Sequence, residues 1–167
     1  PGDALADDCL LRAGMASARR EEFVRAVEIL TRLVKDYPGS DRLAEARFAQ
    51  GEALKELARY SAAIVVFDEI INNLSDSDLI VAAWLRKGDC QFVLGAEEAG
   101  RYAESMESYR VVANMTGADA DLRLQAAYKI GRCLEKMDRT GEAFEQYYLQ
   151  VILPYVDAIE KGSRSGE

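Results

Sequence analysis

The residue types and spacings that could carry catalysis give little support for an enzyme in this sequence. The chain has no histidine, which removes imidazole as a general base, as the partner of a nucleophile and as the usual zinc ligand. Carboxylates do occur in adjacent pairs, such as Asp7 with Asp8 and Glu97 with Glu98. Because adjacent side chains on a helix point to different sides, these pairs suit a solvated acidic face better than acid–base catalysis. We therefore expect that the chain is not an enzyme.

The three cysteines, Cys9, Cys90 and Cys133, are too few and too widely spaced for a zinc site or a disulfide framework. Cys90 and Cys133 both follow a glycine by two residues, as Ala16 and Ala53 do. This position therefore requires a small side chain, and we expect buried thiols there. Phosphate-binding, dinucleotide-binding and EF-hand motifs are also missing from the sequence. The sequence predicts neither a cofactor nor a metal.

Four glycines mark an internal repeat that would position the side chains. Gly14, Gly51 and Gly88 are separated by 37 residues each, and Gly131 lies in the same local pattern. A small residue follows each glycine, and a large apolar residue follows the small one by four positions. These two residues are Ala26 and Leu30, Ala63 and Phe67, Ser105 and Tyr109, and Ala143 and Tyr147. Such periodicity is typical of stacked helix pairs, whose surface usually holds a partner rather than converting a substrate.

The repeated residues have a packing role in such pairs. Glycine on the first helix and a small residue on the second let two antiparallel backbones approach closely, and the larger residue fills the space beside them. Pro38 falls where the second helix of the first pair must end, and Ser40 and Asp41 can cap the next helix. The third segment has about five additional residues before Ser105, which predicts a longer loop over Gly95 to Gly100.

This pattern resembles the tetratricopeptide repeat family, from about Leu5 to about Tyr155. The resemblance implies an all-α fold, a right-handed α-α superhelical solenoid of four helix pairs, in a single domain over 1–161. The expected units cover about 5–38, 41–75, 78–117 and 121–155, followed by a disordered tail at 162–167. The expected helices cover 3–17 and 21–36, 41–57 and 61–73, 78–94 and 101–115, and 119–136 and 140–160.

The resemblance also predicts a partner-binding surface. In the family, first helices line the concave side of the superhelix, and the residues three before and one after the motif glycine face this groove or lie beside it. In this sequence they are Leu11, Met15, Phe48, Glu52, Leu85, Asp89, Tyr128 and Arg132. The four apolar residues predict a stripe that anchors a peptide or helix. The alternative is that this stripe packs neighbouring first helices together. No asparagine lies at these positions, which disfavours the family's carboxylate-clamp subclass.

Charge and hydropathy restrict the partner. The formal net charge is −8, whereas phosphate backbones demand lysine and arginine, so we expect no nucleic-acid binding. Basic or neutral peptides are easier to accommodate. No run of 18 apolar residues occurs, so we expect no membrane insertion.

The last expected helix carries a wide apolar stripe that includes Phe144, Tyr148, Ile152 and Tyr155. The terminal helix of a repeat array is expected to present a polar outer face. We therefore expect either a further repeat or a second copy of the chain to cover this stripe, the latter giving a homodimer through the C-terminal helix.

The sequence thus predicts a non-catalytic protein–protein interaction scaffold that binds a peptide or helix in its concave groove. Two alternatives stay open: a self-assembly module that oligomerises through its terminal helix, and a regulatory domain of a larger enzyme. The 37-residue spacing and the Tyr-Pro-Gly-Ser ending at 37–40 also resemble bacterial cell-envelope members of the family. That resemblance implies a periplasmic or cell-envelope location rather than a cytoplasmic one, and a role in envelope assembly.

Overall fold

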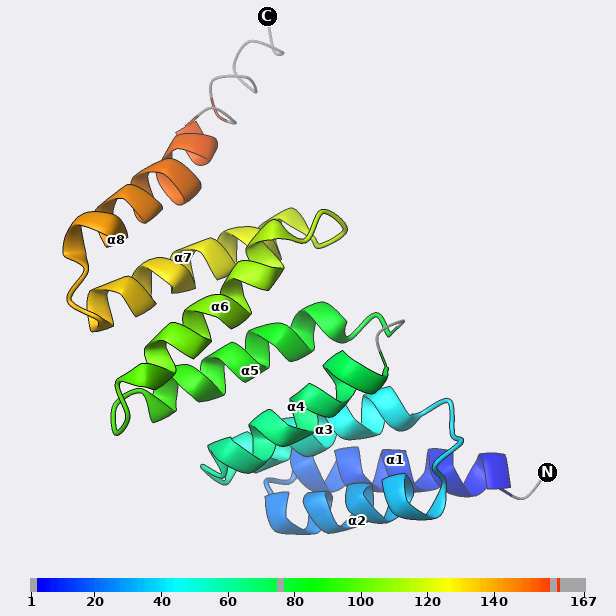
Figure 1. Cartoon of the computed structure of the whole chain (residues 1–167). Coiled ribbons are helices and arrows are strands. Elements are labelled where there is room, and N and C mark those ends of the chain that lie inside the picture. The colour runs from blue at the N-terminus through cyan, green and yellow to red at the C-terminus, as the bar shows by residue number, and fades with distance from the viewer. Residues whose placement is uncertain (1–2, 75–76, 157–158, 160–167) are drawn as a thin grey trace, which may run out of the picture. The chain divides into compact units, whose positions relative to one another are not determined.

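The computed structural model describes residues 3–74, 77–156 and 159, and these residues form helices and turns with no β-strand among them (Figure 1). This confirms the predicted all-α class. The helices are α1 (Asp3–Arg19), α2 (Phe23–Asp36), α3 (Leu43–Glu56), α4 (Tyr60–Asn73), α5 (Ile80–Leu94), α6 (Gly100–Asn114), α7 (Ala120–Lys136), α8 (Thr140–Tyr147) and the π-helical η1 (Tyr148–Ile152).

The chain divides into two compact units, Pro1–Val93 and Leu94–Glu167. The first contains α1 to α4 and nearly all of α5, and the second contains α6 to α8 and η1. The single domain over 1–161 stays a prediction, and the expected tail at 162–167 lies outside the described residues.

The motif glycines lie where the sequence places the close helix contacts. A Cβ added to Gly14 would lie 2.6 Å from Cγ of Leu30, and one added to Gly51 would lie 2.6 Å from Cε1 of Phe67. In the second unit, an added Cβ on Gly131 would collide with the ring of Tyr147. The first helix therefore needs glycine at these positions because the large residue of the second helix occupies the space.

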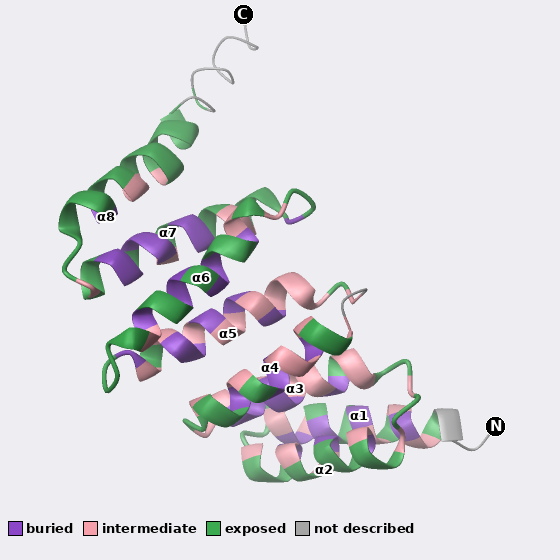
Figure 2. Cartoon of the chain, viewed as in Figure 1, coloured by how far each residue is buried: buried purple, intermediate pink, exposed green. Residues whose placement is uncertain are grey.

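Sequence periodicity explains which helix faces are buried (Figure 2). On α2 the buried residues Ala26, Leu30 and Leu33 recur at helical spacing, and on α4 the buried set includes Ala63, Phe67 and Ile70. The N-cap residue of α3 is Arg42, without a side-chain cap hydrogen bond, rather than Ser40 or Asp41. In the second unit the Asp119 side chain caps α7 by accepting a hydrogen bond from the Asp121 N–H, 2.8 Å away.

The two cysteines at the repeated position are fully buried, as expected, whereas Cys9 is exposed. Burial raises the pKa of the Cys90 thiol to about 12. Burial also raises the pKa of Cys133, whose Sγ donates to Oγ of Ser105 at 3.5 Å. Both thiols are therefore protonated at neutral pH and act as small core side chains.

The tight turns inside three helix pairs share an unusual backbone. Glu21, Ala58 and Asp138 each follow a motif glycine by seven residues, and their φ angles are 62°, 55° and 59°. This left-handed conformation ends the first helix, although none of the three is glycine. The third segment has its additional residues at this place, where α5 ends at Leu94 and α6 begins at Gly100.

The last helix differs from the expected uninterrupted helix over 140–160. After Tyr147 the backbone widens into η1, in which the Leu153 N–H donates to the carbonyl of Tyr148, five residues earlier. The physical reason is Pro154, which has no N–H and whose ring conflicts with the carbonyl of Gln150, four residues earlier. The backbone is helical again over 153–156.

Candidate functional site

Two of the four predicted anchor residues lie in the core. Leu11 is 3 % exposed and Leu85 is 2 % exposed, so neither is available to a partner. Phe48 is half-buried, and its ring lies 5.8 Å from the ring of Phe67, between centroids. These residues match the alternative reading of the apolar stripe, in which it packs helices together.

Leu11 and the exposed Met15 nevertheless border a small concavity. Together with other residues of α1, with Arg42 and with Glu45 of α3, they line a cavity of about 280 Å³. Its rim is charged: Arg12 lies 2.6 Å from Asp8, and Arg42 reaches the same carboxylate at 3.8 Å. Hydrogen bonding to Arg12 lowers the pKa of Asp8. Asp8 on this rim is therefore already paired with two arginines.

The predicted acidic groove residues are also engaged within the first unit. The Arg86 side chain lies 3.1 Å from Glu52 and 3.4 Å from Asp89, and Lys55 lies 3.3 Å from Glu52. The network links α3 to α5. Each carboxylate already has a cationic neighbour: Glu52 links α3 to α5 through Arg86, and Asp89 pairs with Arg86 within α5.

Tyr128 and Arg132 form the exposed part of the predicted set on α7. Tyr128 is 45 % exposed, and its ring centroid lies 5.7 Å from that of Tyr147. A hydrogen bond with Tyr128 raises the pKa of Arg132, which also lies 3.5 Å from Glu135. Burial raises the pKa of Tyr147 to about 12. This group can present one aromatic ring and one fixed positive charge.

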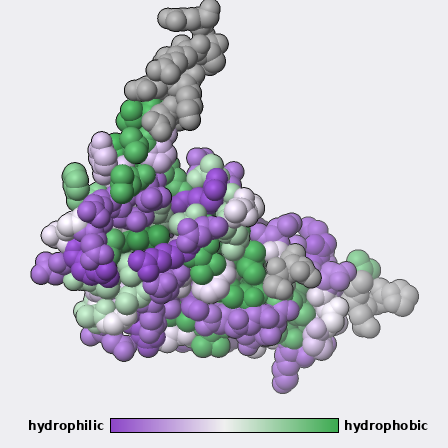
Figure 3. Space-filling model, turned by 45° about the horizontal axis from the view of Figure 1, so that its top comes forward, coloured by the Kyte–Doolittle hydropathy of each residue, from purple (hydrophilic) through white to green (hydrophobic). Residues whose placement is uncertain are grey.

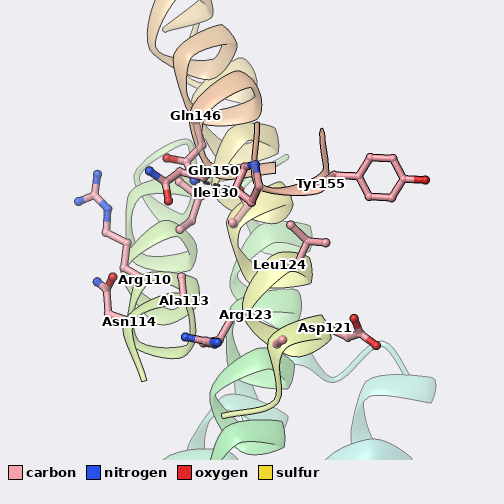
Figure 4. Close-up of a pocket in the computed structure, with 13 residues that line it drawn as sticks. Arg110, Ala113, Asn114, Asp121, Arg123, Leu124, Ile130, Gln146, Gln150 and Tyr155 are labelled. Carbon is pink, nitrogen blue, oxygen red and sulfur yellow. Dashed lines mark hydrogen bonds between the residues drawn. The ribbon is translucent and has the colours of Figure 1, made fainter. Parts of the chain in front are cut away.

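A larger concavity lies in the second unit, between α6, α7 and the last helix (Figure 4). This terminal cleft has a volume of about 670 Å³. Its apolar lining includes Ala113, Leu124, Ala127 and Ile130. Its polar lining includes Arg110, Asn114, Asp121, Arg123, Gln146 and Gln150. An apolar surface with a few polar groups is the usual composition of a binding site.

The cleft contains an arginine with an unsatisfied donor. The Nε atom of Arg123 is buried and has no hydrogen-bond partner among the residues that the structure describes. Leaving a buried donor unpaired costs on the order of 1–3 kcal/mol. Figure 4 shows the Arg123 guanidinium directed toward the side of the cleft that carries Asn114. A ligand with a carboxylate would supply the missing acceptor.

A second arginine can adapt to such a ligand. Arg110 Nη1 lies 2.7 Å from Glu107, and both side chains are at least 45 % exposed. An exposed ion pair of this kind contributes about 0–1 kcal/mol, so a bound carboxylate can replace it at small cost. Gln146 is fixed by its hydrogen bond to the carbonyl of Ala127, at 3.2 Å.

The terminal cleft was not predicted, because the predicted surface followed the first helices, whereas this cleft is bordered by the second helices α6 and α8. The one local signal was Pro154, which lines the cleft together with Tyr155. The proline perturbs the last helix at η1, beside α7, but helix periodicity alone does not reveal the resulting opening.

In the described part of the chain, no group of three or more histidine, cysteine or carboxylate side chains is placed to hold a metal ion. None of the described helices combines the length and the apolar character that crossing a membrane would need.

Comparison with protein families identifies one repeat directly: residues 8–40 match the model of the tetratricopeptide repeat. These residues contain α1, α2 and the turn after them. A comparison with curated protein sequences gave no match.

Solved structures of the MamA protein share the fold. The structure of MamA from residue 41 to its end, from Desulfovibrio magneticus RS-1, has a TM-score of 0.68 at 17 % identity, over 90 % of this chain and 76 % of that one. A double mutant of RS-1 MamA has a TM-score of 0.69 at 19 % identity, over 86 % of this chain and 72 % of that one. MamA of AMB-1 has a TM-score of 0.63 at 19 % identity, over 85 % of this chain and 75 % of that one. The likeness supports the predicted helical-repeat solenoid.

Proposed function

We propose that this chain, in which residues 8–40 match the tetratricopeptide repeat, is a protein–protein interaction scaffold whose partner binds in the terminal cleft. The repeat is typically a non-catalytic interaction module, in agreement with the absence of histidine from the sequence. The observation that carries the proposal is the unsatisfied Arg123 Nε inside an apolar cleft of about 670 Å³.

The shape and lining of the cleft favour a peptide or helix segment with one apolar anchor. Ala113 and Ala127 have short side chains, so a partner side chain can approach between them, and Ile130 offers apolar contact beside them. An apolar residue buried between helices is the usual anchor of such an interface.

The arginines favour an aspartate or glutamate near that anchor. The chain as a whole is acidic, with a net charge of −8, which at long range favours basic partners. Charges beyond about 8 Å are largely screened at physiological ionic strength, so the charges at the cleft decide: Arg123 and Arg110, with Asp121 in the lining and Glu107 beside Arg110. The unsatisfied Arg123 donor favours a carboxylate among these charges. The partner segment therefore combines an apolar side chain with a carboxylate.

Selection from a displayed random-peptide library tests this function. We expect the selected peptides to share an apolar residue close to Asp or Glu. Arg123→Gln should weaken their binding tenfold or more, because a charge-assisted hydrogen bond contributes about 1.5–3 kcal/mol. Arg25→Gln is the matched control, since Arg25 is an exposed arginine on α2 in the other unit. Peptides without acidic residues, or equal binding by both variants, would overturn the proposal.

Localisation belongs to the proposal too. The 37-residue spacing, which resembles that of cell-envelope family members, supports a periplasmic or cell-envelope location. Fractionation of cells that express the full-length protein tests this, and recovery in the cytoplasmic fraction alone would contradict it.

A further inference from the structure

The junctions between successive helix pairs of the first unit repeat one register. Gln50 donates to the Thr31 hydroxyl at 2.8 Å, and Lys87 donates to the Asp68 carboxylate at 2.6 Å. Both donors lie one residue before a motif glycine, and both acceptors lie nineteen residues before their donors. The second helix of one pair therefore meets the first helix of the next pair in a fixed way.

Apolar packing follows the same register. Val27 of α2 packs against the core cluster that contains Phe67 of the next pair. In return, Ala46 of α3 is fully buried in the cluster that contains Leu30 and Leu33 of α2. The junction thus sets large side chains of a second helix against a small residue of the next first helix, and the same small position is fully buried at Ala83 and Ala126.

The last helix presents the second-helix half of this junction without a cover. By repeat position, Phe144 corresponds to Val27, and Tyr148 corresponds to Thr31 and Asp68. Phe144 is 69 % exposed and Tyr148 is 46 % exposed. Their rings stack on one another, 6.1 Å apart between centroids and 10° from parallel. Apolar residues gather along this helix in Figure 3.

The N-terminal helix α1 presents the first-helix half of this junction. Cys9 occupies the position of Ala46, and Ala13 occupies the position of Gln50. Both are exposed on α1, although Ala46 and Gln50 are buried. The two ends of the chain therefore carry complementary halves of a junction that the chain itself repeats, one with large aromatic side chains and one with small side chains.

We propose that a second copy of this chain docks its α1 onto α8 and η1, in the register in which α3 docks onto α2. Pairing two last helices instead would set aromatic rings against aromatic rings and leave the α1 face uncovered. A contact between different faces of identical chains leaves one face free at each end of a dimer, so further copies add end to end, into a filament or a ring. This inference goes beyond the proposed function and does not use the terminal cleft.

Sedimentation velocity of two end-blocked variants tests the proposal. The head variant is Cys9→Glu with Ala13→Glu, and the tail variant is Phe144→Glu with Tyr148→Glu. All four residues are exposed, and thermal melts check that both variants fold. The wild-type chain should grow beyond the dimer as its concentration rises, whereas each variant alone stays monomeric. An equimolar mixture should form a dimer and nothing larger, because only one junction can form.

Several outcomes would overturn the proposal. They are a wild-type chain that stays monomeric, a head variant that dimerises by itself, and a mixture that stays monomeric. A second readout needs no variant: alkylation of Cys9, followed by mass spectrometry, should slow at least several-fold as the wild-type chain associates. The alkylation rate of the amino acid cysteine, added to the same solution, controls for changes in the reagent. Alkylation of the buried Cys90 and Cys133 would report unfolding. A constant Cys9 rate during association would contradict docking through α1.

Discussion

A Cβ added to Gly51 on α3 would lie 2.6 Å from Cε1 of Phe67, whose ring on α4 is fully buried. The ring is enclosed by the core cluster of the first unit, so it cannot move aside freely. This close contact explains why the repeat has glycine at this position.

We expect Gly51→Ala to lower the free energy of unfolding by about 1–3 kcal/mol, since overpacking a tight core has this cost. Alanine is the better helix former by about 1 kcal/mol, so the loss must come from the collision. Gly141 on α8 is the matched control, because an added Cβ there meets nothing within 4 Å. Chemical denaturation should therefore show destabilisation at Gly51 and slight stabilisation for Gly141→Ala. Equal effects at both positions would contradict the packing argument.

The turn after α3 offers a stabilising substitution. Ala58 has a φ of 55°, a conformation that costs a non-glycine residue about 1–2 kcal/mol. Ala58→Gly removes this cost but adds about 0.4–1 kcal/mol of freedom to the unfolded chain, so we expect a net gain near 0.5 kcal/mol. The exposed Ala62 inside α4 is the control, where glycine should destabilise by about 1 kcal/mol. A thermal melt in which both variants lose stability would show that the left-handed turn is not strained.

Alkaline pH should weaken the fold through Cys90. Its pKa is about 12 in the folded chain and 9.0 as the unperturbed value, so the folded state keeps its proton while the unfolded state ionises. The contribution is complete below about pH 9 and is lost as pH rises toward 12, at up to about 1.4 kcal/mol per pH unit. Cys90→Ala should therefore flatten the fall in melting temperature between pH 8.5 and 10.5. Cys9→Ala should leave the fall unchanged, and identical slopes for the two variants would refute the assignment.

Pro154 is expected to shape the terminal cleft. Pro154→Ala restores a backbone N–H and removes the ring that conflicts with the Gln150 carbonyl, so η1 should convert to regular α-helix. We expect a higher melting temperature together with weaker binding of cleft-selected peptides, because the last helix can then follow α7 more closely. Gly39→Ala, in an open turn of the first unit, should change neither property. Unchanged peptide affinity in Pro154→Ala would show that peptide binding in the cleft does not depend on the π-helical turn.

Glycine spacing was sufficient to predict the helix pairs, since Gly14, Gly51 and Gly131 each contact the large residue that the repeat places sixteen positions later. It was also sufficient to predict the buried thiols of Cys90 and Cys133. These features depend on local periodicity and on side-chain size, both of which are written in the sequence.

The candidate site depends on features that periodicity does not encode. The apolar type of Leu11 and Leu85 suits an anchor as well as a core residue, and only packing shows that both are buried. Glu52 and Asp89 suit a binding groove by charge, and only the folded structure shows that Arg86 on α5 lies next to both carboxylates. The terminal cleft is lined by Pro154, which interrupts the repeated helix pattern, and by Arg123, which lies outside the repeated positions.

The most direct test of the proposed function observes Arg123 itself. Its side-chain Nε–H group gives a separate signal in an NMR spectrum of the ¹⁵N-labelled chain, and Arg123→Gln identifies that signal by removing it. On titration with a selected peptide, we expect the Arg123 signal to shift until the cleft is saturated, while the Arg25 signal stays in place. A saturating peptide that leaves the Arg123 signal unmoved would contradict binding in the terminal cleft.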